Sequence, residues 1–539
     1  MNKWLKALTI FLALTTAIAA ETPANRDTND QQDVRRNKPD LEQRVEILEE
    51  ELQKARMQEA TRTYQSAEGM APAASQIYHT QPGSLTFGGY AEAYGTSYNS
   101  RYKNGTADVE RFILYSAYRF NDWILFNAEL EFEHAGFEQV TVVTDVDFAA
   151  REATQEKAEK NEISVEFAYL DFEFSRALQL RLGLNLVPIG ITNYMHEPTT
   201  FYSVRRPISE TTIIPSTWRE LGLLLHGELA DGTIQYKTGI MTGLDGTRFS
   251  AGDWIGEDGS YRGSQATLRD LAFVANVEWV PLSGLTLGST YFVGGAGQGN
   301  VSRVNDSQRL FVPTYQDLGL DDQAASDLQA LQRNNQQLTP VTVHIAEGHA
   351  LYRTGPWDFR ALFVKGWMND EDTRSLNSAT GENIGRVAQG GYLEVAFNLL
   401  SFTSTEQRLM LFLRGEKVNT QKETAQRYAG GKEDILDAFC SSTASCKTTD
   451  QLANGNQDLG VIQAEDAGRE AYGVNGLPDK TNDRSIATIG LAYFPHPNVV
   501  VKLEYARADS ASTYYRDTEF LNPDNNKVDH INFGFGFIF

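Results

Sequence analysis

No stretch beyond Ala20 reaches eighteen consecutive apolar residues, which excludes a membrane-spanning helix from the body of the sequence. This lack does not exclude a membrane protein, because a transmembrane barrel alternates lipid-facing and lumen-facing residues and has the average hydropathy of a soluble chain. The composition of the 539 residues is compatible with such a barrel, with 41% hydrophobic residues, 11% aromatic residues and 44 glycines.

Basic residues are scarce relative to acidic ones. Lys and Arg together number 48 against 71 Asp and Glu, which gives a formal net charge of −23. Nucleic-acid binding relies on stripes of Lys and Arg that neutralise phosphates. The charge balance therefore argues against a nucleic-acid partner.

The start of the sequence has the three regions of an export signal. Lys3 and Lys6 supply positive charge, residues 7–14 are mostly apolar, and Ala17 and Ala19 are the small residues of an A-x-A cleavage site. A membrane anchor is less favoured, because the apolar run is shorter than the ~20 residues that a spanning helix needs. We expect cleavage after Ala19 and therefore an exported protein.

Cysteine is also rare, with only Cys440 and Cys446 in the whole sequence. Both lie in the polar segment 419–484. Export brings the chain into an oxidising compartment, which favours a local disulfide over a metal pair or a nucleophile. We predict a Cys440–Cys446 bridge.

A short helix is predicted to begin at Asp40, an N-cap residue with Gln43 in the capping-box position. Apolar residues then recur at spacings of four, three and four, as in a coiled-coil seam: Leu41, Val45, Leu48 and Leu52. This seam is too short to be stable alone. We expect it to close a homotrimer in which the barrels supply the local concentration; the alternative is a solvated helix with an incidental apolar stripe.

From Ser84 onward the hydrophobic period is two. In residues 178–187, leucines at every second position alternate with Gln179, Arg181, Gly183 and Asn185. Alternation over ten residues is long for a globular strand but suits a tilted membrane strand. The same pattern predicts sixteen strands: 84–98, 108–120, 123–135, 162–174, 178–187, 219–229, 233–242, 269–280, 285–294, 340–353, 357–368, 387–399, 407–418, 485–494, 499–508 and 529–539.

The connections between these strands alternate in length. Asn121-Asp122 and residues 175–177 are short, whereas residues 136–161 and 419–484 are long. Short turns on one side and long loops on the other are typical of outer-membrane barrels, with the short turns in the periplasm. The sequence therefore predicts an all-β fold, a 16-stranded antiparallel transmembrane β-barrel with a short N-terminal periplasmic coiled-coil helix. The expected parts are a signal peptide (1–19), a periplasmic linker with the coiled coil (20–83) and the barrel (84–539).

Two aromatic patterns support a lipid-facing exterior. Trp123, Trp279 and Trp357 share the outward phase, each beside a short turn, as in the aromatic girdle of a membrane barrel. The last strand alternates Phe with small or polar residues and ends at Phe539. This ending resembles the C-terminal signature of Gram-negative outer-membrane proteins, which implies that Phe539 is an assembly signal read by the barrel assembly machinery.

Sixteen strands enclose more space than their own side chains can fill, so the lumen must hold water or a plug. The third long loop, 188–218, contains three internal prolines and several apolar residues, which is unusual for a loop in solvent. We expect this loop to fold into the lumen and constrict a water-filled channel. The alternative is a packed external loop.

The signal peptide, heptad helix, strand count, third loop and terminal Phe together resemble the trimeric porins, specifically the phosphate-selective porin O/P family. The resemblance implies a homotrimer in the bacterial outer membrane, in contact with lipid and lipopolysaccharide, with a row of basic residues that coordinates an anion. Acidic residues in lumen phase depart from a strongly anion-selective wall and fit a transverse field across a general porin's constriction. The candidate constriction residues are Arg205, Arg206, Glu197, Arg219, Arg181, Lys237, Glu129 and Glu131.

Other function classes find less support in the sequence. His196-Glu197 is not followed by the second His of a zinc protease, since residue 200 is Thr, and no G-x-S-x-G nucleophile motif occurs. Gly294–Gly299 lacks the following helix of a nucleotide site. We expect no enzyme, cofactor or metal site, but a porin for passive diffusion of ions and small hydrophilic solutes. The alternative is an outer-membrane receptor or adhesin with little conductance.

Overall fold

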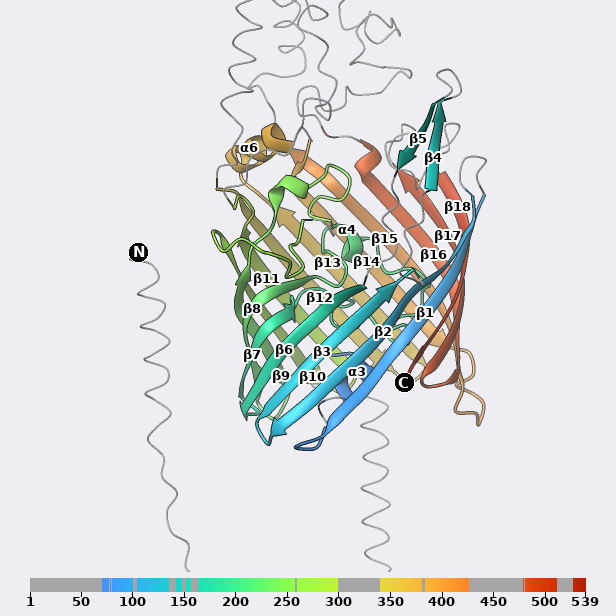
Figure 1. The fold of residues 1–539 in the computed structure, drawn as a ribbon. Helices are drawn as coiled ribbons and strands as arrows, with labels where there is room; N and C mark the ends of the chain where they lie inside the picture. Colours follow the sequence, from blue (N-terminus) through green and yellow to red (C-terminus); the bar gives the residue numbers. More distant parts are fainter. Residues whose placement is uncertain are drawn as a thin grey trace, which may run out of the picture. The chain divides into compact units, whose positions relative to one another are not determined.

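The computed structural model describes residues 70–76, 78, 80–99, 104–134, 142–147, 152–156, 163–256, 259–298, 340–380, 383–425, 478, 480–510 and 527–539. Sixteen strands form a closed barrel (Figure 1), and every neighbouring pair is antiparallel. The prediction of an all-β, sixteen-stranded antiparallel barrel is confirmed. The strands of the barrel are β1 (Leu85–Tyr98), β2 (Thr106–Asn121), β3 (Ile124–Glu133), β6 (Ile163–Ser175), β7 (Leu178–Leu186), β8 (Arg219–Leu229), β9 (Ile234–Thr242), β10 (Leu271–Leu282), β11 (Leu285–Gly295), β12 (Thr342–Thr354), β13 (Trp357–Trp367), β14 (Gly385–Asn398), β15 (Arg408–Thr424), β16 (Asp483–His496), β17 (Val499–Ser510) and β18 (Lys527–Ile538).

A few short elements accompany the barrel. Strands β4 (Val142–Asp147) and β5 (Glu152–Glu156) form a separate two-stranded sheet. The helices are α3 (Pro72–Gln76), α4 (Ser209–Thr212) and α6 (Asp370–Thr380), with the 3₁₀ turns η4 (Gly246–Arg248) and η5 (Lys480–Asn482). Among the residues that the structure describes, no helix is both long and apolar enough to cross a bilayer.

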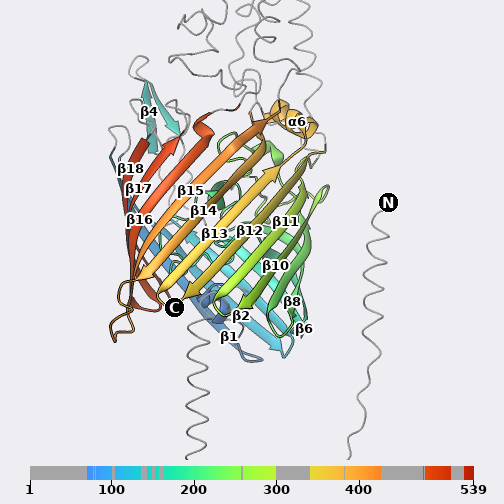
Figure 2. The ribbon, with the colours of Figure 1, turned by 180° about the vertical axis from the view of Figure 1, so that it is seen from behind.

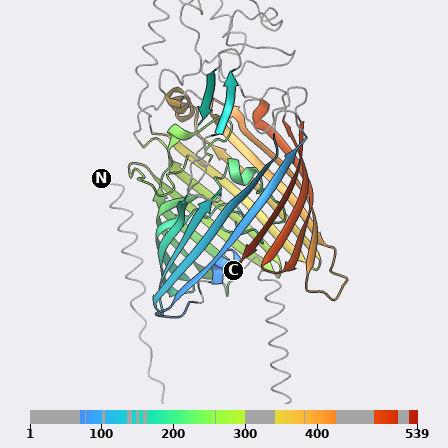
Figure 3. The same ribbon diagram turned by 45° about the vertical axis from the view of Figure 1, so that its right-hand side comes forward.

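Short turns join the strands at one end of the barrel, as the strand rows of Figure 2 show. The barrel closes where β1 pairs with β18 (Figure 3), with Tyr90 opposite Ile538. The largest difference from the predicted bounds is β15, which continues past residue 418 to Thr424. Those six added residues are polar and lack alternation, and the strand continues because Asn419 pairs with Asp483 and Glu423 with Val387.

Outward side chains of the barrel are apolar. Leu393, near the middle of β14, is 70% exposed, and outward Phe363 on β13 is also exposed. The three tryptophans beside short turns, Trp123, Trp279 and Trp357, point outward and remain about half exposed. Alternation along each strand therefore separates an apolar outer surface from the inner one, as the period of two predicts.

The inner surface of β8 to β15 is unexpectedly apolar near the ends that carry the long loops. Inward residues such as Val274, Val343 and Val364 are fully buried, because segments 187–218 and 244–255 pack on them inside the barrel. The core that results also contains Ile189, Ile191, Ile213, Ile214, Trp218, Leu244, Phe249, Trp254 and Ile255 from the two loops. The barrel thus encloses a hydrophobic core along one part of its wall.

Inward glycines let these loops approach the wall. A Cβ atom on Gly366 of β13 would lie 2.1 Å from the Trp254 ring, and one on Gly536 of β18 would lie 2.4 Å from Pro198. Neither distance is compatible with a real side chain, so glycine is required at both positions.

The end of the expected periplasmic linker 20–83 packs inside the barrel. Met70, Ala73 and Ala74 are buried against inward residues of β1, β2, β3 and β6. The Arg119 Nε of β2 donates to the Thr80 carbonyl at 2.9 Å. Residues 1–69, which contain the predicted signal peptide and coiled coil, and Cys440 and Cys446 lie outside the described residues.

Candidate functional site

The loop between β7 and β8 is closed at its base by Asn193. The Asn193 Nδ2 donates to the Val187 carbonyl at 2.6 Å, and its Oδ1 accepts the Trp218 N–H at 2.6 Å. The Val187 N–H donates to the Trp218 carbonyl at 2.8 Å. These bonds join the two ends of the loop and satisfy backbone groups that would otherwise be buried unpaired.

Glu210 of α4 holds the middle of this loop together. Its Oε2 accepts the N–H groups of Ile191 and Thr192, each at 2.7 Å. Its Oε1 accepts the hydroxyl of Tyr392, an inward residue of β14, at 2.8 Å. One buried carboxylate therefore fixes both the loop's own shape and its position on the wall.

The tip of the loop reaches the wall on the other side of the lumen. The Ile208 N–H donates to Glu416 of β15 at 2.6 Å, and the Val204 N–H donates to Glu504 of β17 at 2.7 Å. The Lys502 Nζ donates to the Ser203 carbonyl at 2.9 Å. The loop 187–218 thus crosses the lumen and is anchored at both ends.

A second segment, residues 243–256, also enters the barrel, which the sequence analysis did not anticipate. The Trp254 Nε1 donates to the Gly385 carbonyl at 2.9 Å, and the Thr420 hydroxyl donates to the Ala251 carbonyl at 2.7 Å. The residues that point inward from the strands did contain a signal for this insertion. Val274, Phe292, Val343 and Ile345 are too apolar for a water-lined wall and indicate a covering segment.

A cavity of about 290 Å³, named the passage here, lies beside the loop tip. Its lining comes from the loop and from inward residues of β1, β2 and β15 to β18. Arg205 and Arg206, both predicted constriction residues, belong to this lining. The other charged lining residues are Arg111, Arg414, Glu92, Glu110, Glu416 and Glu504.

Both loop arginines have defined positions. The Arg205 guanidinium lies over the Tyr94 ring of β1, 4.1 Å from its centroid. The Arg206 NH1 donates to the Ser216 hydroxyl at 2.6 Å, and Arg206 NH2 donates to the His196 carbonyl at 3.4 Å. Contacts of this kind hold the two positive charges at the passage rather than in bulk water.

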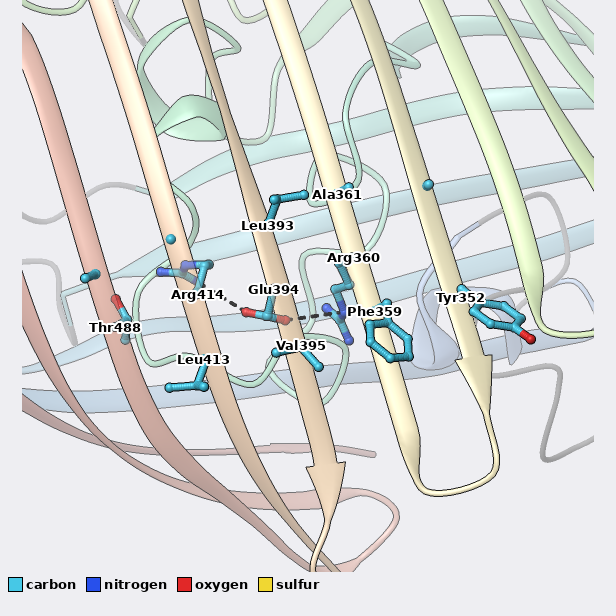
Figure 4. Close-up of a pocket in the computed structure, with 13 residues that line it drawn as sticks. Tyr352, Phe359, Arg360, Ala361, Leu393, Glu394, Val395, Leu413, Arg414 and Thr488 are labelled. Atoms are coloured by element: carbon cyan, nitrogen blue, oxygen red, sulfur yellow. Dashed lines mark ion pairs between the residues drawn. The ribbon is translucent and has the colours of Figure 1, made fainter.

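Ion pairs continue along the wall from the passage. Figure 4 shows Arg360 of β13, Glu394 of β14 and Arg414 of β15 in a row. The Glu394 carboxylate lies 3.5 Å from the Arg360 Nε and 3.7 Å from the Arg414 NH1, and the Arg414 Nε lies 2.7 Å from the Glu416 carboxylate. Acidic and basic groups therefore alternate along this wall and offset one another's charge.

Arg181 and Lys237 lie elsewhere in the lumen, near the N-terminal segment. The Arg181 NH2 donates to the Tyr78 hydroxyl at 2.7 Å, and its Nε contacts Asp171 at 2.9 Å. The Lys237 Nζ lies 4.9 Å from the Tyr194 ring centroid. Neither side chain lines the passage formed by the described residues. Both instead contact elements that fill the lumen.

Glu197 joins the N-terminal segment to the loop. Its two carboxylate oxygens accept the N–H groups of Ala73 and Ala74, each at 2.9 Å. Burial raises the pKa of the Glu197 carboxyl to about 7, and the two N–H donors act in the opposite direction. Glu197 thus fastens residues 70–76 to the loop.

The remaining predicted residues, Glu129, Glu131 and Arg219, do not themselves line the passage formed by the described residues. Glu129 and Glu131 of β3 are buried, and Glu131 lies 3.6 Å from the Arg111 NH1. Arg219, at the start of β8, lies 3.5 Å from the Glu166 carboxylate of β6. Of the eight predicted residues, only Arg205 and Arg206 therefore line the passage, and the other six contact the wall or the segments that fill the lumen.

The fold and the site define a closed sixteen-stranded barrel whose lumen is narrowed by inserted segments and contains a cavity lined by charged residues. No protein-family model matches the chain. The chain is 26% identical over 464 residues to an uncharacterized protein of Aquifex aeolicus (strain VF5), covering 83% of this chain and 80% of that protein.

Solved structures that resemble the chain include three outer-membrane proteins. OmpT of Vibrio cholerae has a TM-score of 0.43 and 9% identity, over 84% of this chain and 97% of that chain. The outer-membrane channel DcaP of Acinetobacter baumannii has a TM-score of 0.41 and 10% identity, with coverage of 84% and 97%. OmpF of Salmonella typhi in complex with daunomycin has a TM-score of 0.42 and 10% identity, with coverage of 84% and 97%. The fold assignment itself rests on the strand pairing of this chain.

Proposed function

We propose that this chain is a porin of the bacterial outer membrane that lets ions and small hydrophilic solutes diffuse passively. The observation that carries the proposal is the charged passage beside a loop that crosses a closed barrel. Such a passage offers water and fixed charges to a solute, while the barrel wall separates it from lipid.

The outer surface supports insertion into a bilayer. An apolar side chain such as Leu393, 70% exposed, would contribute an unfavourable hydration free energy of about 1–2 kcal/mol in water. Dozens of outward apolar residues far exceed the patch that a soluble monomer tolerates. A hydrocarbon environment removes this cost, and a closed barrel leaves no unpaired strand edge in it.

The lining of the passage supports a weak selectivity for the sign of an ion's charge. The loop arginines set which sign is preferred. Its lining includes four arginines and four glutamates, so strong selectivity for one sign of charge is not expected. Arg205 and Arg206 offer guanidinium donors suited to phosphate or carboxylate oxygens. Membership of the phosphate-selective porin O/P family and an anion preference are finer proposals that rest on these two residues and on the sequence resemblance.

The cellular setting belongs to the same proposal. The signal peptide directs export and is cleaved, Phe539 is read by the barrel assembly machinery, and the heptad helix closes a homotrimer embedded in lipid and lipopolysaccharide. Phe539 is placed for such a role at the seam, because its backbone exchanges two 2.9 Å hydrogen bonds with Gly89 of β1. We propose no enzymatic activity.

A receptor or adhesin barrel with little conductance is the second candidate. The observation that favours it is the extent of lumen filling, since segments 70–76, 187–218 and 243–256 all pack against the inner wall. Conductance distinguishes the two functions, because an adhesin needs no continuous water path.

The experiment is single-channel recording of the untagged full-length mature chain in planar bilayers. We expect discrete conductance steps, which Ala506→Trp reduces because inward Ala506 of β17 lines the passage. Outward Ala487 of neighbouring β16 provides the matched control, and Ala487→Trp should conduct like the wild type. A folded barrel without conductance would reject the porin and favour the receptor or adhesin.

A further inference from the structure

Three ionisable side chains converge behind the loop that crosses the lumen. Glu129 comes from β3, Glu166 from β6 and His196 from the loop, and one ligand atom of each lies within 4.8 Å of the other two. The two glutamates are fully buried and His196 is 1% exposed. Distant parts of the sequence thus bring two carboxylates and an imidazole into one enclosed place.

The hydrogen bond at one ring nitrogen of His196 determines whether the other ring nitrogen carries a proton or a lone pair. Its Nδ1 lies 3.1 Å from the Asn193 carbonyl, which can only accept, so the Nδ1 carries the proton. In the neutral imidazole the Nε2 then presents a lone pair, directed at Glu129 Oε1 at 3.3 Å and Glu166 Oε2 at 3.8 Å. A lone pair that faces two carboxylates is repelled unless a proton or a metal ion lies between them. A backbone carbonyl on the other ring nitrogen is also the usual support of a metal-ligating histidine.

The carboxylates leave oxygen atoms without donors. Among the described residues, no N–H or hydroxyl group donates to either oxygen of Glu166 or to Glu129 Oε2, and these oxygens have only the neighbouring carboxyl groups as hydrogen-bond partners, including that of Glu131. The Arg219 NH1 is 3.5 Å from Glu166 Oε1, too far for a good hydrogen bond. Buried carboxylate oxygens without donors are costly, and this second observation also points to a cation in their midst.

We propose that Glu129, Glu166 and His196 bind a Zn²⁺-type divalent ion that fastens the loop to the barrel wall. Two oxygen donors with one imidazole suit zinc, whereas Mg²⁺ and Ca²⁺ prefer oxygen donors alone. Ligands of a tetrahedral ion with bonds of ~2.1 Å are about 3.4 Å apart, so small rotations of the two carboxylates complete the site. The fourth position is left to water.

The ion would link three elements that the chain connects only through long loops. His196 is also coupled to the passage, because its carbonyl accepts a 3.4 Å hydrogen bond from Arg206. Zinc binding would therefore rigidify the part of the loop that positions an arginine of the passage. The inference does not depend on the porin function, since the site is defined by its own donors.

The test is titration of the untagged full-length mature chain, stripped of metal in detergent, with ZnCl₂ by calorimetry, together with metal content by mass spectrometry. We expect one tightly bound Zn²⁺ per chain that excess Mg²⁺ or Ca²⁺ does not displace. His196→Gln and Glu166→Gln should each weaken binding at least tenfold, about 1.4 kcal/mol. The matched control is His226→Gln, which alters another buried inward imidazole, paired with Asp171 at 3.0 Å, and should leave zinc affinity unchanged.

Wild-type affinity in His196→Gln and Glu166→Gln, or no zinc bound by the wild type, would overturn the proposal. Heat-modifiable gel migration checks that each variant folds. If a variant does not fold, Co²⁺ added to the wild type decides: we expect visible absorption bands of a four- or five-coordinate nitrogen and oxygen site. A spectrum of hydrated Co²⁺ alone would reject the site.

Discussion

The inner surface of this barrel has two parts that differ in polarity. On β8 to β15, near the long loops, inward residues such as Val274, Val343 and Val364 are apolar and covered by inserted segments. On β15 to β18 and β1 to β2, inward residues such as Glu416 and Glu504 are charged and line the passage. Alternation along a strand shows only which residues point inward. In these two parts, the polarity of an inward residue also indicates whether an inserted segment or the passage lies against it.

The difference also separates two ways of holding a loop inside a barrel. On the apolar part, burial of side chains and close approach to glycines supply the stabilising free energy. On the charged part, hydrogen bonds from loop N–H groups to Glu416 and Glu504 fix the position of the loop tip. The first mechanism depends on shape and the second on individual polar atoms.

The largest effect is expected on the apolar part. Trp254→Ala should lower the free energy of unfolding by about 3–5 kcal/mol, because it leaves a cavity against Gly366 in the enclosed core. The measurement is urea unfolding in lipid vesicles followed by gel migration. Tyr98→Ala, which removes an aromatic ring that lines the passage, should cost less. Equal losses of unfolding free energy in the two variants would show that the apolar and charged parts do not differ in how they stabilise the barrel.

A charge on the outer surface should have a somewhat smaller effect. Leu393→Arg should cost about 2–4 kcal/mol, because Leu393 is outward near the middle of β14 and would face the bilayer midplane. Thr488→Arg on β16 places the same charge in the passage and should fold with nearly normal yield. Folding yields in vesicles provide the comparison, and equal yields would show that the facing of these strands is wrong.

Replacement of the two loop arginines should have a smaller effect, which is measured as a change in ion selectivity. Arg205→Ala with Arg206→Ala should shift the reversal potential in a salt gradient toward cations, because the pair focuses a positive field in the passage. A tenfold change in selectivity corresponds to about 1.4 kcal/mol. Arg386→Ala, which removes an arginine paired with Asp370 outside the passage lining, is the control and should behave like the wild type. A wild-type potential in the double variant would reject the role of the pair.

The smallest effect is expected from reduction of the predicted Cys440–Cys446 bridge. A disulfide that closes so short a loop restrains only its own segment. Thermal unfolding of the barrel should therefore be nearly unchanged after treatment with a reducing agent. A large fall in the melting temperature would instead show that this segment supports both parts of the barrel.

The strands and their facing could be predicted from sequence because a period of two is local information. Residues 219–229, for example, form β8 with the predicted bounds. The position of an inward residue around and along the lumen could not be predicted, because it depends on strand stagger. Arg181 and Lys237 are inward on β7 and β9 yet contact Tyr78 and Tyr194 rather than the passage. The apolar inward residues indicate that some segment covers them, but the insertion of residues 243–256 and 70–76 depends on contacts between distant parts of the sequence, such as Trp254 with Gly385.

The glycines of β18 link the narrowing of the lumen to the register in which the barrel closes. Gly534 and Gly536 alternate with outward phenylalanines on β18, and Val204 and Pro198 of the crossing loop sit against their inner side. Strand β18 thus both closes the wall by pairing with β1 and provides the surface against which the loop packs. If the pairing of β18 were slipped by one residue, phenylalanine side chains would face the loop instead of glycines. Val204 and Pro198 would then have no room against the wall, so the position of the loop in the lumen depends on the native register of β18.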